Sequence, residues 1–289
     1  MIVARSPREL EPAERAVAIG TFDGVHRGHR KVIDATKATG LRSTVITFEP
    51  HPRLVLGYEV ELVTSFERRV ELIGAVGPDE LLVVEFTPDL SRLEPEAFVA
   101  DVLGSIGTRI VVTGEDFRFG AGRRGDVELL RRLGLDVRPV PLLDGVSSSL
   151  IRELVRAGDV RAAAALLGRP FELDGLVVAG DQRGGTLGYP TANLALDPHA
   201  LVPAYGIYAG EALGRRAAAS VGVNPHYGGS ERRVEAFLLD FEGDLYGRRL
   251  RLELWERLRE ERAFASEEEL VAQIARDVEA AKAAERPDV

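Results

Sequence analysis

One ten-residue stretch near the N-terminus constrains the fold of this chain more than any other feature. It spans residues 20–29, reads Gly-Thr-Phe-Asp-Gly-Val-His-Arg-Gly-His, and follows an apolar run over residues 16–19. The apolar run predicts a buried strand, and residues 28–39 predict a helix. A glycine-rich turn between a strand and a helix presents free backbone N–H groups and the positive end of the helix dipole. The stretch therefore predicts an anion site of the kind that holds a nucleotide.

Two histidines, His26 and His29, lie three residues apart on one face of the first helical turn. Imidazoles placed there can contact phosphate oxygens and stabilise the charge that grows during phosphoryl chemistry, so we assign both as catalytic. The alternatives are a tight turn with two exposed histidines, or a metal site that lacks a third protein ligand at suitable spacing. The residues of the turn that we expect to contact the nucleotide are Gly20, Phe22, Asp23, Gly24 and Gly28.

Composition indicates a globular protein with room for two domains, because 45% of the 289 residues are hydrophobic and 29% are charged. Cysteine is absent, and neither a membrane-spanning stretch nor a secretory signal is recognisable, so we expect a cytoplasmic protein without a membrane partner. The net charge of −9 argues against a nucleic-acid partner but leaves room for a local ATP site. Arginine pairs occur at residues 68–69, 123–124, 131–132 and 215–216, and most of them are expected on solvated helix faces or turns.

The first part of the chain alternates strand-like and helix-like segments. Helices are expected near Ser65, after Glu94-Pro95 and over residues 127–133. The further strand-like runs cover residues 44–48, 81–86, 109–113 and 136–141. This alternation predicts a parallel sheet covered on both faces, with ligands at the carboxyl ends of its strands. The loops that begin at Gly20, Glu49 and Gly114 are therefore expected to meet at one site.

The pattern changes after residue 147, first to helices over 149–157 and 160–167 and then to short strands with glycine turns. These strand-like runs cover residues 175–179, 207–213, 216–223, 234–241 and 249–255. They predict a small antiparallel β-barrel. A capping box at Ser266 and Glu269 starts a closing helix, whose apolar stripe is Leu270, Ile274 and Val278. The predicted fold is therefore α/β, with a boundary between the two domains near residues 168–174.

Two further segments of the first domain carry candidate ligand contacts. Residues 113–120 place Phe117 and Phe119 where they can bracket a flat ring, or equally where they can join the core. Residues 146–149 are followed by Arg152, which suits a polyphosphate, although an ordinary serine cap explains the serines as well. The segment Thr-Phe-Glu-Pro-His-Pro at 47–52 fits either a site loop or a proline-rich turn.

A second motif, over residues 180–193, is too rich in glycine for a strand and too patterned for a linker. Thr191 and Asn193 offer two neutral oxygens that suit a hard cation such as Mg²⁺; a long turn with an Asx cap is the alternative. Glu235 begins a predicted strand and shares a face with Phe237, Leu239 and Phe241. If that face points into the barrel, partial burial raises the pKa of Glu235 and makes it a better base. The alternative is an edge residue whose carboxylate lies in water.

Both motifs resemble those of one family, the bacterial bifunctional riboflavin kinase/FAD synthetases. Phe-Asp-Gly-Val-His-Arg-Gly-His is similar to the signature of the His-x-Gly-His nucleotidylyltransferases, and Pro-Thr-Ala-Asn at 190–193 is similar to the riboflavin kinase signature. The resemblance covers roughly residues 14–282. It implies a Rossmann-like nucleotidylyltransferase domain over residues 1–170 that adenylylates FMN to FAD. It also implies a barrel domain over residues 171–289 that phosphorylates riboflavin to FMN, with ATP and Mg²⁺ used in both steps.

The resemblance also implies roles for individual residues. In the first domain, ATP phosphates are contacted by Ser147, Ser148, Ser149 and Arg152, and the flavin by Asp116, Phe117, Phe119 and Arg123. In the second, the nucleotide lies on Gly180, Gly184 and Gly188, Thr191 and Asn193 hold the metal, and Glu235 is the base for the 5′-hydroxyl of riboflavin. Four residues depart from the family pattern, namely Thr21, Ser149, Gly185 and His226.

Two other functions stay open at this point. One is an FMN adenylyltransferase whose second domain binds flavin without catalysis. The other is a transferase for a different phosphorylated alcohol, such as a cytidylyltransferase, which leaves the Pro-Thr-Ala-Asn half unexplained. The expected partners are riboflavin, FMN and ATP, and the sequence does not define an oligomeric state.

Overall fold

The computed structural model describes residues 1–180, 188–223 and 232–289. Contacts between residues divide the chain into two units. The first unit contains Met1–Val60 and Phe66–Val146, and the second contains Glu61–Ser65 and Ser147–Val289. The short segment Glu61–Ser65 therefore packs with the second unit although it lies in the sequence of the first.

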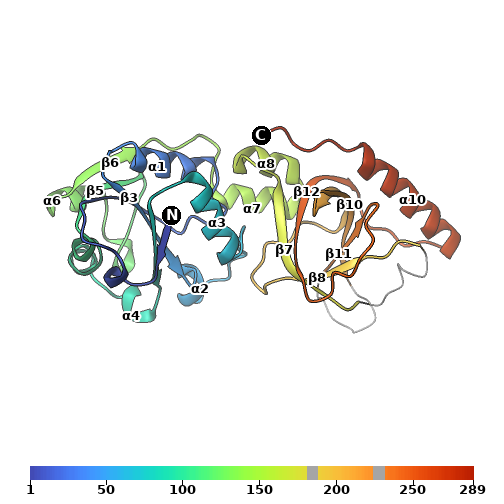
Figure 1. The fold of residues 1–289 in the computed structure, drawn as a ribbon, viewed down its shortest axis with the longest axis horizontal. Coiled ribbons are helices and arrows are strands. Elements are labelled where there is room, and N and C mark those ends of the chain that lie inside the picture. The colour runs from blue at the N-terminus through green and yellow to red at the C-terminus, as the bar shows by residue number, and fades with distance from the viewer. Residues whose placement is uncertain (181–187, 224–231) are drawn as a thin grey trace. The chain divides into compact units, whose positions relative to one another are not determined.

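The first unit is built on a six-stranded parallel sheet with the order β1-β4-β3-β2-β5-β6 (Figure 1). Its strands are β1 (Ile2–Ala4), β2 (Arg15–Ile19), β3 (Arg42–Glu49), β4 (Glu80–Glu85), β5 (Thr108–Gly114) and β6 (Asp136–Val140). The parallel sheet predicted from the sequence is confirmed. β1 was not predicted, because three residues are too few to show a period of two.

Helices cover both faces of this sheet. The longer ones are α1 (Arg27–Lys37) and α3 (Phe66–Val76), and the others are η1 (Pro7–Glu9), α2 (Pro52–Val55), α4 (Pro88–Ser91), α5 (Pro95–Phe98), η2 (Val99–Leu103), η3 (Gly104–Ile106), η4 (Ala121–Arg123) and α6 (Val127–Arg132). Ala18 packs with Ile33 of α1 and Ile73 of α3, whereas its neighbour Val17 packs with Phe98 and Leu130 of the other layer. Adjacent residues of β2 thus face opposite cores, as the uninterrupted apolar strand predicts.

The second unit begins with two helices, α7 (Ser148–Ala157) and α8 (Val160–Leu167), which lead into a closed antiparallel barrel. Its strands are β7 (Phe171–Val178), β8 (Ala192–Ala195), β9 (Gly206–Ala212), β10 (Arg215–Val223), β11 (Arg232–Leu238) and β12 (Arg249–Arg259), in the barrel order β10-β11-β8-β7-β12-β9. The predicted barrel is confirmed. The end of the glycine-rich motif is a strand after all, because Ala192 and Asn193 pair with β11.

The core of the second unit joins the helices to the barrel. Ile151 of α7 and Leu167 of α8 belong to the same buried cluster as Leu252 of β12. The closing helix α10 (Glu267–Ala283) starts as predicted, because the Ser266 hydroxyl oxygen accepts a hydrogen bond of 3.3 Å from the backbone N–H of Glu269. By contacts α7 and α8 belong to the second unit, although the functional boundary at residue 170 assigns them to the first. That functional division stays a prediction.

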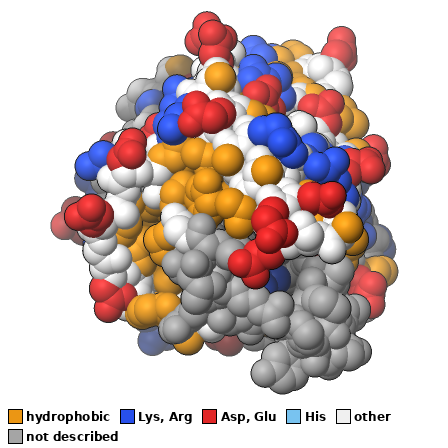
Figure 2. Space-filling view, turned by 90° about the vertical axis from the view of Figure 1, so that its right-hand side faces the viewer, with side chains coloured by type: hydrophobic (Ala, Val, Ile, Leu, Met, Phe, Trp, Pro, Cys, Tyr) orange, Lys and Arg blue, Asp and Glu red, His pale blue; other side chains and the backbone are white. Residues whose placement is uncertain are grey.

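Surface properties fit the composition. No helix in the described ranges combines the length and the apolar character that crossing a bilayer requires. On the face drawn in Figure 2, aspartate and glutamate side chains are interspersed with lysine and arginine side chains, and hydrophobic side chains gather between them. Such a mixed face differs from the basic surface that general nucleic-acid binding needs.

Candidate functional site

The turn between β2 and α1 has a strained backbone. Phe22 and Val25 adopt positive φ angles of 50° and 40°, and Gly24 between them has φ 86°. Phe22, Asp23 and Val25 are at most 2% exposed, so the turn is fixed by the side chains packed around it. A left-handed conformation at a β-branched residue costs on the order of 1–3 kcal/mol and is typical of functional loops.

His26 is the N-cap of α1 and lies against His29. Its Nδ1 accepts a hydrogen bond of 3.2 Å from the backbone N–H of His29, and the two rings stack with centroids 3.6 Å apart. Because Nδ1 acts as an acceptor, the ring proton of neutral His26 lies on Nε2. A Cβ on Gly28 would lie 3.2 Å from two atoms of the His26 ring, so glycine leaves room for this cap. The structure therefore brings the two predicted histidines into direct contact.

His29 is held in its neutral form. Burial, the neighbouring His26 and the Arg69 guanidinium all lower its pKa well below the ordinary 6.5. Its Nδ1 is buried and has no hydrogen-bond partner in the described part of the chain. His29 can therefore meet an anion as a neutral N–H donor, without a full positive charge of its own.

Arg69 is a residue of this region that the sequence analysis missed. Most arginine pairs were expected on solvated helix faces or turns, yet Arg69 is 1% exposed and donates hydrogen bonds to Thr21, Phe48 and Glu49. The signal was present in the sequence, because Arg69 lies three and four residues before Leu72 and Ile73, the buried face of α3. Arg69 thus joins two of the three loops that were expected to meet.

The predicted flavin-binding residues have mixed environments. Phe119 belongs to the hydrophobic core of the first unit, and Phe117 stacks on it with ring centroids 5.6 Å apart. Asp116 is exposed in the loop before the two rings, and Arg123 is exposed in η4 after them. The core alternative therefore holds for Phe119, and the flavin contacts stay a prediction.

The predicted phosphate-binding segment belongs to the second unit, whereas His26 and His29 belong to the first. Ser147 is the N-cap of α7 and accepts a hydrogen bond of 3.1 Å from the backbone N–H of Leu150. Arg152 is buried, and its Nε–H donates to the Glu61 carbonyl oxygen at 2.6 Å. Ser148 and Ser149 form the start of the same helix. Contacts of these residues with ATP stay a prediction.

In the second unit, three predicted residues come together where β8 pairs with β11. The Thr191 hydroxyl donates to Glu235 Oε2 at 3.2 Å, and Glu235 lies directly opposite Asn193 in the strand pair. Asn193 is buried, and its Oδ1 has no hydrogen-bond partner among the described residues. A Cβ on Gly180 would lie 2.2 Å from Asn193 Nδ2, so only glycine fits against this side chain. Such a set of neutral and anionic oxygens suits a hard divalent cation.

Of the two orientations that the sequence left open for Glu235, the inward one is wrong. Val234, Ala236 and Leu238 of β11 are buried in the barrel core, whereas Glu235 is half-buried on the opposite face. There it forms an ion pair with Arg233, with Arg233 Nη1 and Glu235 Oε1 3.5 Å apart. The register follows from the alternation of side chains, since small and apolar residues occupy the inward positions of the strand.

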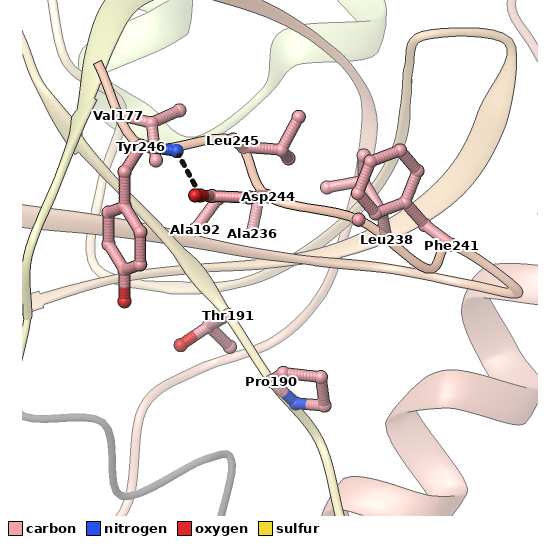
Figure 3. Close-up of a pocket in the computed structure, with 11 residues that line it drawn as sticks. Val177, Pro190, Thr191, Ala192, Ala236, Leu238, Phe241, Asp244, Leu245 and Tyr246 are labelled. Carbon is pink, nitrogen blue, oxygen red and sulfur yellow. Dashed lines mark hydrogen bonds between the residues drawn. The ribbon is translucent and has the colours of Figure 1, made fainter. Parts of the chain in front are cut away.

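A pocket of about 170 Å³ adjoins Thr191 (Figure 3). Apolar side chains make up most of its wall, among them Val177, Leu238, Phe241 and Leu245. The Asp244 carboxylate turns back to accept a hydrogen bond of 2.8 Å from the backbone N–H of Tyr246, another residue of the wall. Gly188 is exposed with φ 85°, and Gly184, Gly185 and His226 lie outside the described residues.

Comparison with known proteins agrees with both halves of this description. Residues 9–145 match the family model described as FAD synthetase, and residues 167–284 match the one described as riboflavin kinase. The bifunctional riboflavin kinase/FMN adenylyltransferases of Escherichia coli (strain K12) and Bacillus subtilis (strain 168) are each 35% identical to this chain. Both alignments cover 92% of this chain and 91% of the relative.

A crystal structure from Streptococcus pneumoniae, described as a macrolide-efflux protein, is similar to this chain with a TM-score of 0.89 at 30% identity. The match covers 98% of this chain and 99% of that chain. The likeness in fold therefore spans both units. Since curated relatives align over nine tenths of the chain and both family models match in the predicted order, the chain belongs to the family of bifunctional riboflavin kinase/FMN adenylyltransferases.

Proposed function

We propose that the second unit phosphorylates riboflavin with ATP to give FMN, and that the first unit adenylylates FMN with a second ATP to give FAD and pyrophosphate. Membership of the family supports both activities. The observation that carries the proposal is the cluster of Glu235, Thr191 and Asn193 beside an apolar pocket. A domain that merely bound flavin would have no need of a base next to two oxygen ligands.

In the kinase step, Glu235 is the base. The 5′-hydroxyl of riboflavin must lose a proton as its oxygen attacks the γ-phosphorus, and ADP leaves with the electrons of the broken bond. Glu235 takes that proton, and its ion pair with Arg233 holds the carboxylate in place. The neighbouring apolar pocket suits a flat aromatic ring, which riboflavin and ATP both carry.

Mg²⁺ fits the same cluster. The Thr191 hydroxyl donates a hydrogen bond to Glu235, which leaves the lone pairs of Thr191 Oγ1 for a cation. Asn193 Oδ1 is buried and has no hydrogen-bond partner in the described part of the chain. Thr191 and Asn193 would hold the ion, whose chemistry is to neutralise charge on the transferred phosphate.

We propose in addition that the enzyme acts in the cytoplasm.

In the adenylyltransfer step, no strong base is required. The phosphate of FMN has a second pKa of about 6 and is therefore largely dianionic at neutral pH. It attacks the α-phosphorus of ATP, and pyrophosphate leaves. The Nε2–H of His26, the neutral His29 and the N-terminus of α1 stabilise the charge on the phosphate oxygens.

Two substitutions separate the two sites. Glu235→Gln is expected to abolish FMN formation while FAD is still made from supplied FMN, and His29→Ala is expected to do the converse, so that FMN accumulates. Chromatographic separation of the flavins measures both products in one reaction. Loss of both activities in either folded variant would contradict separate sites. Unchanged FMN formation in Glu235→Gln would show that Glu235 is not the base. The other candidate, a second unit that binds flavin without catalysis, would be favoured if the unsubstituted protein made FAD from supplied FMN but no FMN from riboflavin.

A further inference from the structure

Arg69 is a buried cation whose only part in the site so far is its contribution, after burial and His26, to the lowered pKa of His29. It lies in the first turn of α3, is 1% exposed, and forms its hydrogen bonds with protein groups. Its Nη1 donates to the Thr21 carbonyl oxygen at 3.1 Å. Its Nη2 donates to the Phe48 carbonyl oxygen at 3.2 Å and to Glu49 Oε2 at 2.5 Å. One guanidinium thus joins the loops that follow β2 and β3.

One of the two loops joined by Arg69 is the turn that leads to His26. Thr21 directly precedes the strained residues Phe22–Val25, and its carbonyl oxygen also accepts a hydrogen bond of 3.1 Å from the Thr47 hydroxyl. A backbone with two non-glycine residues at positive φ persists only when its surroundings hold it. A guanidinium spreads its donors over a rigid planar fork, whereas the three donors of an ammonium group share one nitrogen and rotate about it.

Stability is a poor explanation for this arginine. Its Nε is buried without a hydrogen-bond partner in the described part of the chain, and Glu49 alone is recorded as its ion-pair partner there. Burying a charge with an unsatisfied donor costs free energy that an apolar side chain would not cost. The geometry is instead that of a clamp on the loop that ends in His26.

We infer that Arg69 is a positioning residue for adenylyl transfer, which fixes the Thr21–His26 turn so that both imidazoles meet the reacting phosphates. It acts through the turn and does not touch ATP. The inference rests on the proposed FMN adenylyltransferase activity. It goes beyond that activity because it states that a side chain of α3 keeps His26 and His29, at the start of α1, in the position that the reaction requires.

The test compares Arg69→Met and Arg69→Lys with a matched control, Arg68→Met, in the full chain. Arg68 is the neighbouring arginine, and its guanidinium pairs at 2.9 Å with Glu71, three residues further along α3. The measured quantities are kcat and KM for ATP in FMN adenylylation. Riboflavin phosphorylation by the second unit is the control for effects outside the first unit, and circular dichroism is the control for folding.

We expect Arg69→Met to lower kcat about 100-fold, the size of effect that a misplaced catalytic group produces, with KM for ATP within about 3-fold. Lysine should restore part of the loss, and Arg68→Met should behave as the unsubstituted protein. If Arg69→Met does not fold, lowered kcat at unchanged KM in Arg69→Lys supports the inference and unchanged kcat overturns it.

Three other results overturn the inference: unchanged kcat in folded Arg69→Met, a rise in KM alone, which indicates direct contact with ATP, or equal loss of kinase activity. Failure of the proposed function itself is distinguishable, because the unsubstituted protein would then make no FAD from FMN and ATP.

Discussion

Single residues explain why the motif around His26 has its spacing. His26 caps α1 with its own ring, Gly28 leaves the space for that ring, and His29 supplies both the N–H that is capped and the partner that is stacked. The departure at Thr21 is compatible with this arrangement, because the recorded bonds of Thr21 to Arg69 and Thr47 use its backbone carbonyl oxygen. A change of side chain at this position leaves this carbonyl oxygen in place to accept both hydrogen bonds.

The low pKa of His29 predicts a pH dependence of stability. Below the ordinary value of 6.5 the unfolded chain binds a proton on this imidazole, whereas the folded chain does not. The stability of the first unit should therefore fall as the pH falls below 6.5, by at most about 1.4 kcal/mol per pH unit from this one group. Amide hydrogen exchange of β2, measured at about pH 7 and about pH 5.5, reports this stability.

The matched variants for this measurement are His29→Gln and His199→Gln. His199 is exposed in the second unit, so its replacement should leave the pH dependence of β2 unchanged. His29→Gln should make that dependence shallower. An equal slope in His29→Gln and in the unsubstituted protein would show that His29 is protonated similarly in the folded and unfolded states.

At the scale of elements, the strands β8 and β11 show what the sequence could and could not predict. Their chemistry was recognisable, because Thr191, Asn193 and Glu235 do come together. The sequence did not predict which face of β11 carries Glu235. Val234 and Ala236 lie on one face of the strand, and Glu235 lies on the other with the half-buried Phe237. Period-two patterns state which residues share a face, and barrel closure decides which face is inside.

The contact between Gly180 and Asn193 gives a prediction at this scale. In Gly180→Ala the added methyl group would lie 2.2 Å from Asn193 Nδ2 and must displace that side chain. Riboflavin phosphorylation should fall about 100-fold, as expected for a displaced ligand, while FAD formation from supplied FMN is retained. Steady-state assays of riboflavin phosphorylation and of FAD formation from FMN measure the two rates.

Gly214→Ala is the control for strain alone, because Gly214 has φ 71° and open space around its Cα. It should reduce stability without a comparable loss of kinase activity. Wild-type kinase activity in Gly180→Ala would mean that Asn193 has no part in the reaction.

At the scale of the whole molecule, the two units do not divide where the sequence changes from helix-like to strand-like segments. The sequence places a boundary after α8, where helices give way to strands. Packing places α7 and α8 with the barrel, and it adds Glu61–Ser65 from the middle of the first half. A segment of five residues has no periodicity that predicts which core it joins, so Val63 in the barrel core could not be foreseen.

This packing predicts that residues 147–289 form a more stable fragment than residues 171–289. The shorter fragment loses the buried side chains of α7 and α8, among them Ile151, Val155, Val160 and Leu167. At roughly 1.5–3 kcal/mol for each large apolar side chain, that loss is comparable to the whole stability of a domain. Urea unfolding followed by the fluorescence of Trp255, which is 1% exposed, compares the fragments. Equal midpoints would show that the barrel is independent of the helices.

The central claim is that one chain carries out both flavin reactions in sequence. The most direct measurement is a time course of the pure protein with riboflavin, ATP and Mg²⁺, with the flavins separated by chromatography. FMN should appear first and FAD later, in one tube. If neither riboflavin nor directly supplied FMN gave a product, the proposed bifunctional activity would be contradicted.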